Sequence, residues 1–133
     1  MKSQFAFLCE AANITANNLF NVLGGGIATL FFPQLPIQRT LSLLLRIEYN
    51  YILESGPHKI EIRLLDSDGK DKMIPLLLDV DFPNNLRFFN FIANLNITFD
   101  VYGLHSVEIS VDRHSITSIP LQVTKLETEH PKI

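Results

Sequence analysis

Three aspartates near a predicted hairpin turn are the residues of this chain best suited to hold a metal ion. Asp66, Asp68 and Asp71 lie close together, and Ca²⁺ takes about six to eight oxygen ligands, many of them from carboxylates. The segment is not an EF-hand loop, because Lys70 stands where ligands should continue and no glutamate closes it. Aspartate and glycine also dominate turns for conformational reasons. We therefore interpret the segment as a turn and keep the three aspartates as calcium candidates.

The histidines and the single cysteine lack the spacing of a zinc site. The histidines are far apart in the sequence, at His58, His105, His114 and His130. Cys9 alternates with Phe5 and Phe7, so we expect it to point into the core as a small hydrophobic residue. No serine stands in a Gly-x-Ser-x-Gly elbow. The sequence therefore predicts no catalytic residue, no metal site beyond the aspartates and no cofactor.

The run Gly24-Gly25-Gly26 has the composition of a phosphate-binding loop without its context. Such loops need a helix start behind the glycines, or a lysine and a hydroxyl residue after them. The residues that follow, 27–32, are mostly apolar and strand-like. We interpret the glycines as a bulge, a bend or a point of close backbone approach.

The elements that would position these residues are strands, because apolar residues alternate along most of the chain. The pattern is clearest for Leu41, Leu43, Leu45, Ile47 and Tyr49, and turn residues separate one such run from the next. The predicted strands cover residues 4–14, 19–32, 40–51, 58–65, 73–82, 88–101, 105–112 and 116–126. The pattern predicts a single all-β domain over residues 1–133, an antiparallel β-sandwich of about eight strands with a polar tail from about residue 127. A closed β-barrel is the alternative.

Composition narrows the classes of partner. The chain has 133 residues, a net charge of -3 and 47% hydrophobic residues, which is ample for one core without a disulfide or metal. Lysine and arginine are interleaved with acidic residues, so we expect no nucleic acid partner. Glu10 interrupts the short apolar run at the start, which is unlike a signal peptide or a membrane span. We expect a reducing, cytoplasmic setting and no membrane contact.

Several segments, in their order and spacing, resemble a family of short, uncharacterised bacterial β-sandwich proteins that forms a domain of unknown function. The segments that carry the resemblance cover residues 5–12, 19–26, 65–70, 103–112 and 119–123. The resemblance spans nearly the whole chain, implies a small bacterial β-domain and assigns no site residue. Members often have an aromatic residue where this chain has His105. The terminal hairpin also resembles the last two strands of immunoglobulin-like domains, in which Tyr102 would hydrogen-bond back to the backbone.

These observations favour a non-catalytic module, not an enzyme, that binds a protein partner or another copy of itself. Apolar side chains on the polar faces of the predicted strands are the interface candidates, namely Leu44, Leu65, Leu77 and Ile92. The alternative function is a small-ligand or calcium-binding module that uses the loops at one end of the sandwich.

Overall fold

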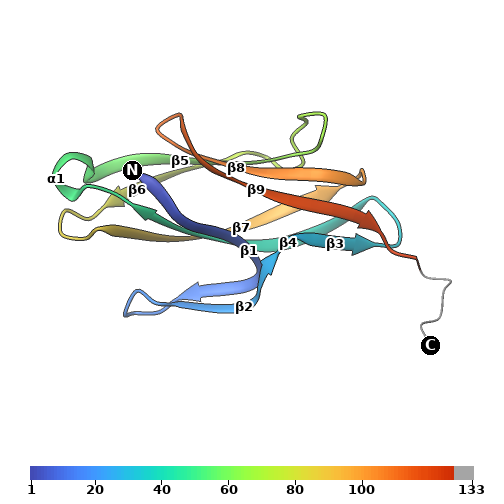
Figure 1. The fold of residues 1–133 in the computed structure, drawn as a ribbon, viewed down its shortest axis with the longest axis horizontal. Helices are drawn as coiled ribbons and strands as arrows, with labels where there is room; N and C mark the ends of the chain where they lie inside the picture. The colour runs from blue at the N-terminus through green and yellow to red at the C-terminus, as the bar shows by residue number, and fades with distance from the viewer. Residues whose placement is uncertain (128–133) are drawn as a thin grey trace.

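The computed structural model describes residues 1–127 and builds them from nine β-strands and one short helix (Figure 1). The elements are β1 (Lys2–Ile14), β2 (Phe20–Ile27), β3 (Thr29–Phe32), β4 (Ile37–Glu48), α1 (Tyr51–Glu54), β5 (Gly56–Leu65), β6 (Leu76–Phe82), β7 (Phe88–Phe99), β8 (Gly103–Val111) and β9 (His114–Lys125). The prediction of about eight strands is thus confirmed to within one strand. Most of the predicted polar tail, with His130, lies outside the described residues.

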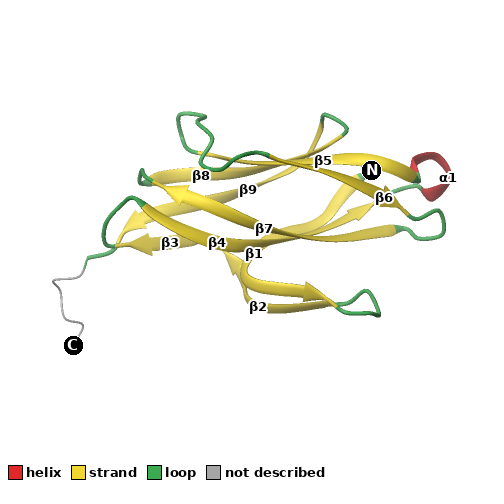
Figure 2. Ribbon diagram, turned by 180° about the vertical axis from the view of Figure 1, so that it is seen from behind, coloured by secondary structure: helices red, strands yellow, loops and turns green. Residues whose placement is uncertain are grey.

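The strands form two sheets that face each other, as Figure 2 shows. One sheet has the order β2-β1-β4-β7, and the other has the order β3-β9-β8-β5-β6. All pairs are antiparallel except β3 and β9, which run parallel, so the prediction of a purely antiparallel arrangement is wrong. The predicted strand over residues 19–32 is also wrong as a unit, because the chain leaves one sheet after Ile27 and joins the other at Thr29.

The core lies between the sheets and is built from the alternating residues of the central strands. Leu41, Leu43, Leu45 and Ile47 of β4 are fully buried against inward side chains of β5, β8 and β9. Each large aliphatic side chain buried in this way contributes roughly 1.5–3 kcal/mol. The strong alternation in residues 41–49 is therefore the sequence signal that fixes which face of β4 lies inward.

The hairpin of residues 10–27, which we name the arm, bends away from the two-layer body and forms a further layer on the outer face of the first sheet (Figure 1). A register shift between Leu8 and Cys9 opposite Ile27 and Gly25 marks a bulge in β2. Gly24 and Gly26 have φ angles of +60° and +84° there, a conformation that favours glycine. The predicted bulge at the glycines is confirmed. No strand pairing joins the two sheets within residues 1–127, so the closed barrel is wrong, although the first sheet curls.

A second cluster of side chains lies between the arm and the outer face of the first sheet. The guanidinium of Arg46 lies 5.1 Å, 6.0 Å and 5.5 Å from the ring centroids of Phe5, Phe20 and Phe88. The same group donates hydrogen bonds to the side-chain oxygens of Asn90 (2.8 Å) and Gln4 (3.4 Å). Stacking of a cation on several aromatic faces stabilises it where water is partly excluded, so Arg46 fastens the arm to the sheet.

Candidate functional site

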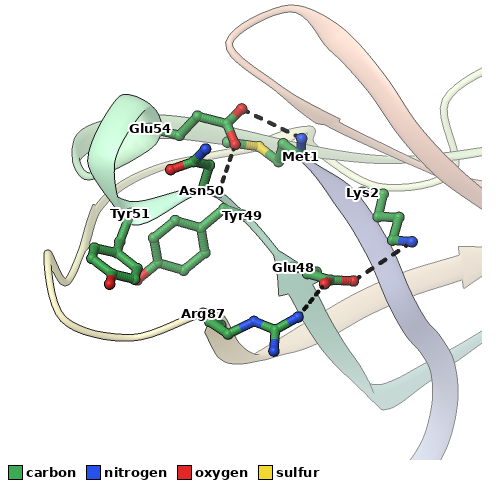
Figure 3. Close-up of a pocket in the computed structure, with 8 residues that line it drawn as sticks. All are labelled: Met1, Lys2, Glu48, Tyr49, Asn50, Tyr51, Glu54 and Arg87. Atoms are coloured by element: carbon green, nitrogen blue, oxygen red, sulfur yellow. Dashed lines mark hydrogen bonds and ion pairs between the residues drawn. The ribbon is translucent and has the colours of Figure 1, made fainter.

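A depression at the end of the molecule that holds α1 lies next to exposed apolar side chains (Figure 3). It has a volume of about 460 Å³ and is shallow. Its lining comes from the start of β1, the end of β4, α1 and the loop before β7, with the residues Met1, Lys2, Glu48, Tyr49, Asn50, Tyr51, Glu54 and Arg87. Three segments far apart in the sequence therefore meet at this end.

The four-residue helix α1 is held by a dense capping network. The Asn50 side chain accepts hydrogen bonds from the backbone N–H groups of Ile52 (2.9 Å) and Leu53 (3.4 Å), which satisfies donors that a helix start leaves open. The Glu54 carboxylate accepts a 2.9 Å bond from the Asn50 N–H. That bond holds the pKa of Glu54 below its usual range, and the nearby Met1 amino group adds to the effect. One turn of helix is stable here because both of its ends are bonded.

The helix holds three consecutive large apolar residues at the surface. Ile52 is 78% exposed, Leu53 is 81% exposed, and Tyr51 is 41% exposed. Leu86, in the loop before β7, is also exposed. We name Tyr51, Ile52 and Leu53 the apolar tip. A rigid group of this kind loses little conformational entropy on binding, and clustered exposed apolar side chains mark contact surfaces more often than isolated ones do.

Charged groups in one network line the depression beside the tip. The Glu48 carboxylate accepts a 3.0 Å bond from Arg87 and lies 3.6 Å from the Lys2 ammonium, as Figure 3 shows. The buried Tyr49 fixes the floor, because its hydroxyl donates a 2.6 Å bond to the Pro83 carbonyl. Burial raises the pKa of Tyr49, with the charge of Asp81 adding to it. Paired charged side chains at the edge of an apolar surface are typical of the polar rim of a protein interface.

A histidine at the start of β5 ties the helix to the turn between β8 and β9. The His58 Nδ1 atom contacts the Asp112 carboxylate and its Nε2 atom contacts the Glu54 carbonyl, both at 2.5 Å. Two acceptors facing both ring nitrogens require the doubly protonated ring, which donates to each. Burial opposes that charge, but the bonds to Asp112 and Glu54 outweigh it and raise the pKa of His58. The His58 ring also lies 4.4 Å from the ring of Phe82.

The three calcium candidates do not share a ligand site. Asp66 is buried and accepts backbone bonds from Asp68 and Lys70, while its carboxylate lies 3.1 Å from the Lys72 ammonium. The Lys70 backbone bond is the main cause that holds the pKa of Asp66 low. Asp71 lies outside the strands, forms an isolated β-bridge with Leu65 and accepts two bonds of 3.1 Å from Arg63. Within residues 1–127 no group of three or more metal-ligating side chains is placed to hold a metal ion.

The four interface candidates from the sequence lie in different environments. Leu44 is 1% exposed and sits between Phe7 of β1 and Ile92 of β7 on the face that the arm covers. The sequence does not say whether Leu44 is covered by its own chain or by a partner. The structure shows that its own chain covers it, so Leu44 offers no surface to a partner. Leu65 and Ile92 are half-buried, whereas Leu77 of β6 is 69% exposed.

Two further residues that sequence analysis singled out lie in the interior. Cys9 is fully buried, its thiol contacts the Ser42 carbonyl at 3.5 Å, and burial raises its pKa. His105 occupies the interior as an aromatic residue would, 5.5 Å from the Phe99 ring, and its Nδ1 lies 3.0 Å from the Gly103 carbonyl. Its Nε2 has no hydrogen-bond partner in the described part of the chain. Tyr102 does bond to backbone, but its hydroxyl donates to Phe32 of β3, 70 residues earlier.

Sequence analysis missed the apolar tip because it extends the predicted strand through residue 51 and ends it at a turn. The available signal was a capping residue, Asn50, followed by three residues that interrupt the alternation before Gly56. Within residues 1–127 no helix has the length and apolar character needed to cross a membrane.

Comparison with known proteins identifies the family of this chain and assigns it no activity. No match is found among curated proteins. One of the solved structures that match is "Pseudomonas fluorescens alkylpurine DNA glycosylase AlkC bound to DNA containing an abasic site analog". That match has 10% sequence identity and a TM-score of 0.43, and it covers 90% of this chain but 30% of that one. The model of a family of unknown function, DUF6941, matches residues 4–124, so the chain belongs to the DUF6941 family.

Proposed function

We propose that this protein is a non-catalytic protein-binding module and that the apolar tip on α1 is its binding surface. The single observation that carries the proposal is the exposure of Ile52 (78%) and Leu53 (81%) on a helix whose backbone is fixed by Asn50. An apolar residue in a flexible loop is often exposed without any bond that fixes it. Here the capping network of α1 fixes the backbone that holds Ile52 and Leu53 at the surface. Binding energy from burying two such side chains, roughly 1.5–3 kcal/mol each, is typical of a central contact.

The partner that fits the tip is a protein with an apolar groove. The tip is convex, so it would insert in the groove, and the Lys2, Glu48 and Arg87 side chains would form the polar rim at one side. Because Glu48 pairs with both Lys2 and Arg87, these three side chains carry only one net positive charge, and the rim demands no strongly charged partner. An ordinary, nearly neutral protein surface around an apolar groove satisfies both features.

The absence of catalysis is part of the proposal, and the state of the reactive side chains supports it. In the described part of the chain, the histidine in contact with a carboxylate is His58, and both of its ring nitrogens face acceptors. A general base needs a free ring nitrogen to take a proton. The buried Cys9 thiol, with its raised pKa, is a poor nucleophile.

We further propose that the module is an immunoglobulin-like sandwich of a bacterial cytoplasm. In that architecture one sheet holds mainly the early strands of the chain and the other holds the last two strands beside a middle one. The orders β1-β4-β7 and β9-β8-β5 agree with this arrangement, and β3 adds to β9 as an extra edge strand. The bacterial setting rests on the sequence resemblance described above, and the cytoplasmic setting rests on the single cysteine, which forms no disulfide within the chain.

The proposal is tested by changing the tip without changing the fold. The double variant Ile52→Asp with Leu53→Asp introduces charge at two exposed positions, so its free energy of unfolding should stay within about 0.5 kcal/mol. Leu77→Asp is the matched control, because Leu77 is also a large apolar side chain and is 69% exposed on another surface. Quantitative affinity purification from native cells, followed by titration of the identified protein, should show at least about a tenfold loss of affinity for the tip variant alone. Equal affinity for all three forms would contradict the proposal.

A further inference from the structure

The two sheets have four edge strands, and three of them are protected against pairing with another strand. β3 has only four residues. β2 is interrupted by its bulge and by the left-handed glycines. β6 follows Pro75 and carries Asp79 and Asp81 on its exposed side. Short length, bulges, proline and charge are the devices by which proteins blunt sheet edges.

The fourth edge strand, β7, lacks all of these devices. Its twelve residues contain no charge, no proline and no glycine. Its register with β4 runs without a shift from Phe88 to Phe99. A long, regular and uncharged edge presents backbone groups that another strand can pair with.

One hydrogen bond shows which backbone groups of β7 face its open edge. The Thr98 N–H donates to the Lys72 carbonyl, away from β4. Residues of an antiparallel strand alternate between facing the neighbour and facing away, so Asn90, Ile92, Asn94 and Asn96 face the same way as Thr98. Among residues 1–127 the backbone N–H and C=O groups of these four residues have no partner on that side.

Side chains next to the open edge suit a pairing strand. The Asn94 and Asn96 side-chain oxygens accept bonds from Ser42 and Thr40 of β4, which leaves their NH₂ groups without a partner among the described residues. A cavity of about 310 Å³ lies beside them, walled by Met73, Ile74 and Leu76. Ile74 is 86% exposed, more than any other large apolar residue in the described chain.

We propose that β7 pairs in antiparallel fashion with β7 of a second copy of this chain, about a two-fold axis at Ala93. With the axis there, Asn90 lies opposite Asn96 and Ile92 lies opposite Asn94, so all four outward-facing residues bond across the axis. The stretch is therefore complementary to itself, which is the requirement for a closed two-fold interface. The Thr98 N–H already donates to the Lys72 carbonyl of its own chain, so by symmetry the pairing ends before Thr98 at both ends.

The dimer joins two four-stranded sheets in one continuous sheet. It involves none of the residues of the apolar tip, so it stands or falls independently of the proposed function. Because β7 begins at the α1 end and its pairing is antiparallel, the two tips would lie at opposite ends of the joined sheet. Such a dimer could engage two partners at once, which raises overall affinity where both sites are within reach.

The test uses the whole chain in sedimentation velocity from about one to several hundred micromolar, a range in which typical homodimers dissociate. The mass should rise from 15.1 kDa to twice that value. Asn94→Pro removes an N–H that faces the open edge and leaves the β4 ladder intact, so it should weaken the dimer by about tenfold or more. Asn94→Ala is the matched control: it removes the same side chain but keeps the N–H, and it should still dimerise.

Backbone amide exchange on the unmodified protein guards against a variant that fails to fold. The amides of Asn90, Ile92, Asn94 and Asn96 should become protected as the concentration rises, while that of Leu77 on β6 should not. A protein that stays monomeric at every concentration would overturn the proposal. So would unchanged dimerisation of Asn94→Pro, or exchange of the four amides that is independent of concentration.

Discussion

Asn90 of β7 donates a 3.0 Å hydrogen bond from its side-chain amide to the backbone carbonyl of Asn18, in the turn of the arm 72 residues earlier. The bond joins the far end of the arm to the opposite edge of the same sheet. Its side-chain oxygen meanwhile accepts from Arg46. One asparagine therefore holds both the arm and the cation beneath it, which explains why Leu44 on the outer face of this sheet is buried without a partner.

The first prediction concerns Arg46. Arg46→Lys should lower the free energy of unfolding by about 1–2 kcal/mol, because an ammonium cannot stack on three rings and bond two amides at once. Arg39→Lys is the control, since Arg39 is exposed and lies over a single ring, that of Phe32. Urea titration of both variants measures the difference. Equal losses for the two would show that the cluster does not fasten the arm.

The second prediction concerns the interior position of Leu44. Leu44→Ala should cost about 2–5 kcal/mol, the range for a buried leucine that leaves a cavity. Leu77→Ala, at a 69% exposed position, should change stability by less than about 0.5 kcal/mol. Thermal or chemical unfolding compares them. If Leu44→Ala left the free energy of unfolding unchanged, Leu44 would not be buried in the monomer and would again be a candidate interface residue.

How far the sequence predicts this molecule depends on whether the signal is local. The inward face of β4 follows from its alternation, and the bulge in β2 follows from three glycines, since both are properties of short segments. The cover of Leu44 depends on how far the arm bends back to Asn90, and that contact spans most of the chain. The parallel pairing of β3 with β9 is equally non-local. Such contacts leave no pattern within a single window of sequence.

The candidate site shows the same limit. A tyrosine, an isoleucine and a leucine in a row read equally well as the end of a buried strand, and their exposure depends on the Asn50 cap and the Glu54 bond. The three aspartates are close in sequence, yet Asp66 turns toward Lys72 and Asp71 toward Arg63. Proximity in sequence made these aspartates calcium candidates, but their ion-pair partners point Asp66 and Asp71 toward different cations of the chain.

The third prediction is a dependence of stability on pH through His58. The pKa of His58 is raised in the folded protein, so its stabilisation is full below the unfolded pKa of about 6.5 and is lost as pH rises through the folded value. The pKa of Asp112 is lowered by its bond to His58, so its own contribution is lost only as pH falls through that lowered value. Unfolding measured at about pH 5.5 and about pH 9 should show a larger decline for the natural protein than for His58→Gln. If the free energy of unfolding fell by the same amount in both proteins, the doubly protonated state of the His58 ring would be contradicted.

The fourth prediction concerns calcium. Millimolar calcium should leave the melting temperature unchanged, because a ligand raises it only by binding the folded state, and the carboxylates of Asp66 and Asp71 are engaged by cations of the chain. Asp66→Asn should lower the melting temperature by weakening the turn and leaving Lys72 with Asp100 alone. Asp68→Asn, at an exposed position, is the control and should be neutral. A calcium-dependent rise that disappears in Asp66→Asn would revive the metal site.

The most direct test of the protein-binding account is photo-crosslinking in native cells, with a photoreactive phenylalanine analogue placed at Leu53 and, separately, at Leu77. Binding through the apolar tip should give a discrete adduct with one protein from position 53. That adduct should be absent from position 77 and should be lost when Ile52→Asp is added to the Leu53 probe. The purified partner should then bind the unmodified protein and not the tip variant. Identical adduct patterns from both positions, or an adduct at position 53 that survives Ile52→Asp, would contradict it.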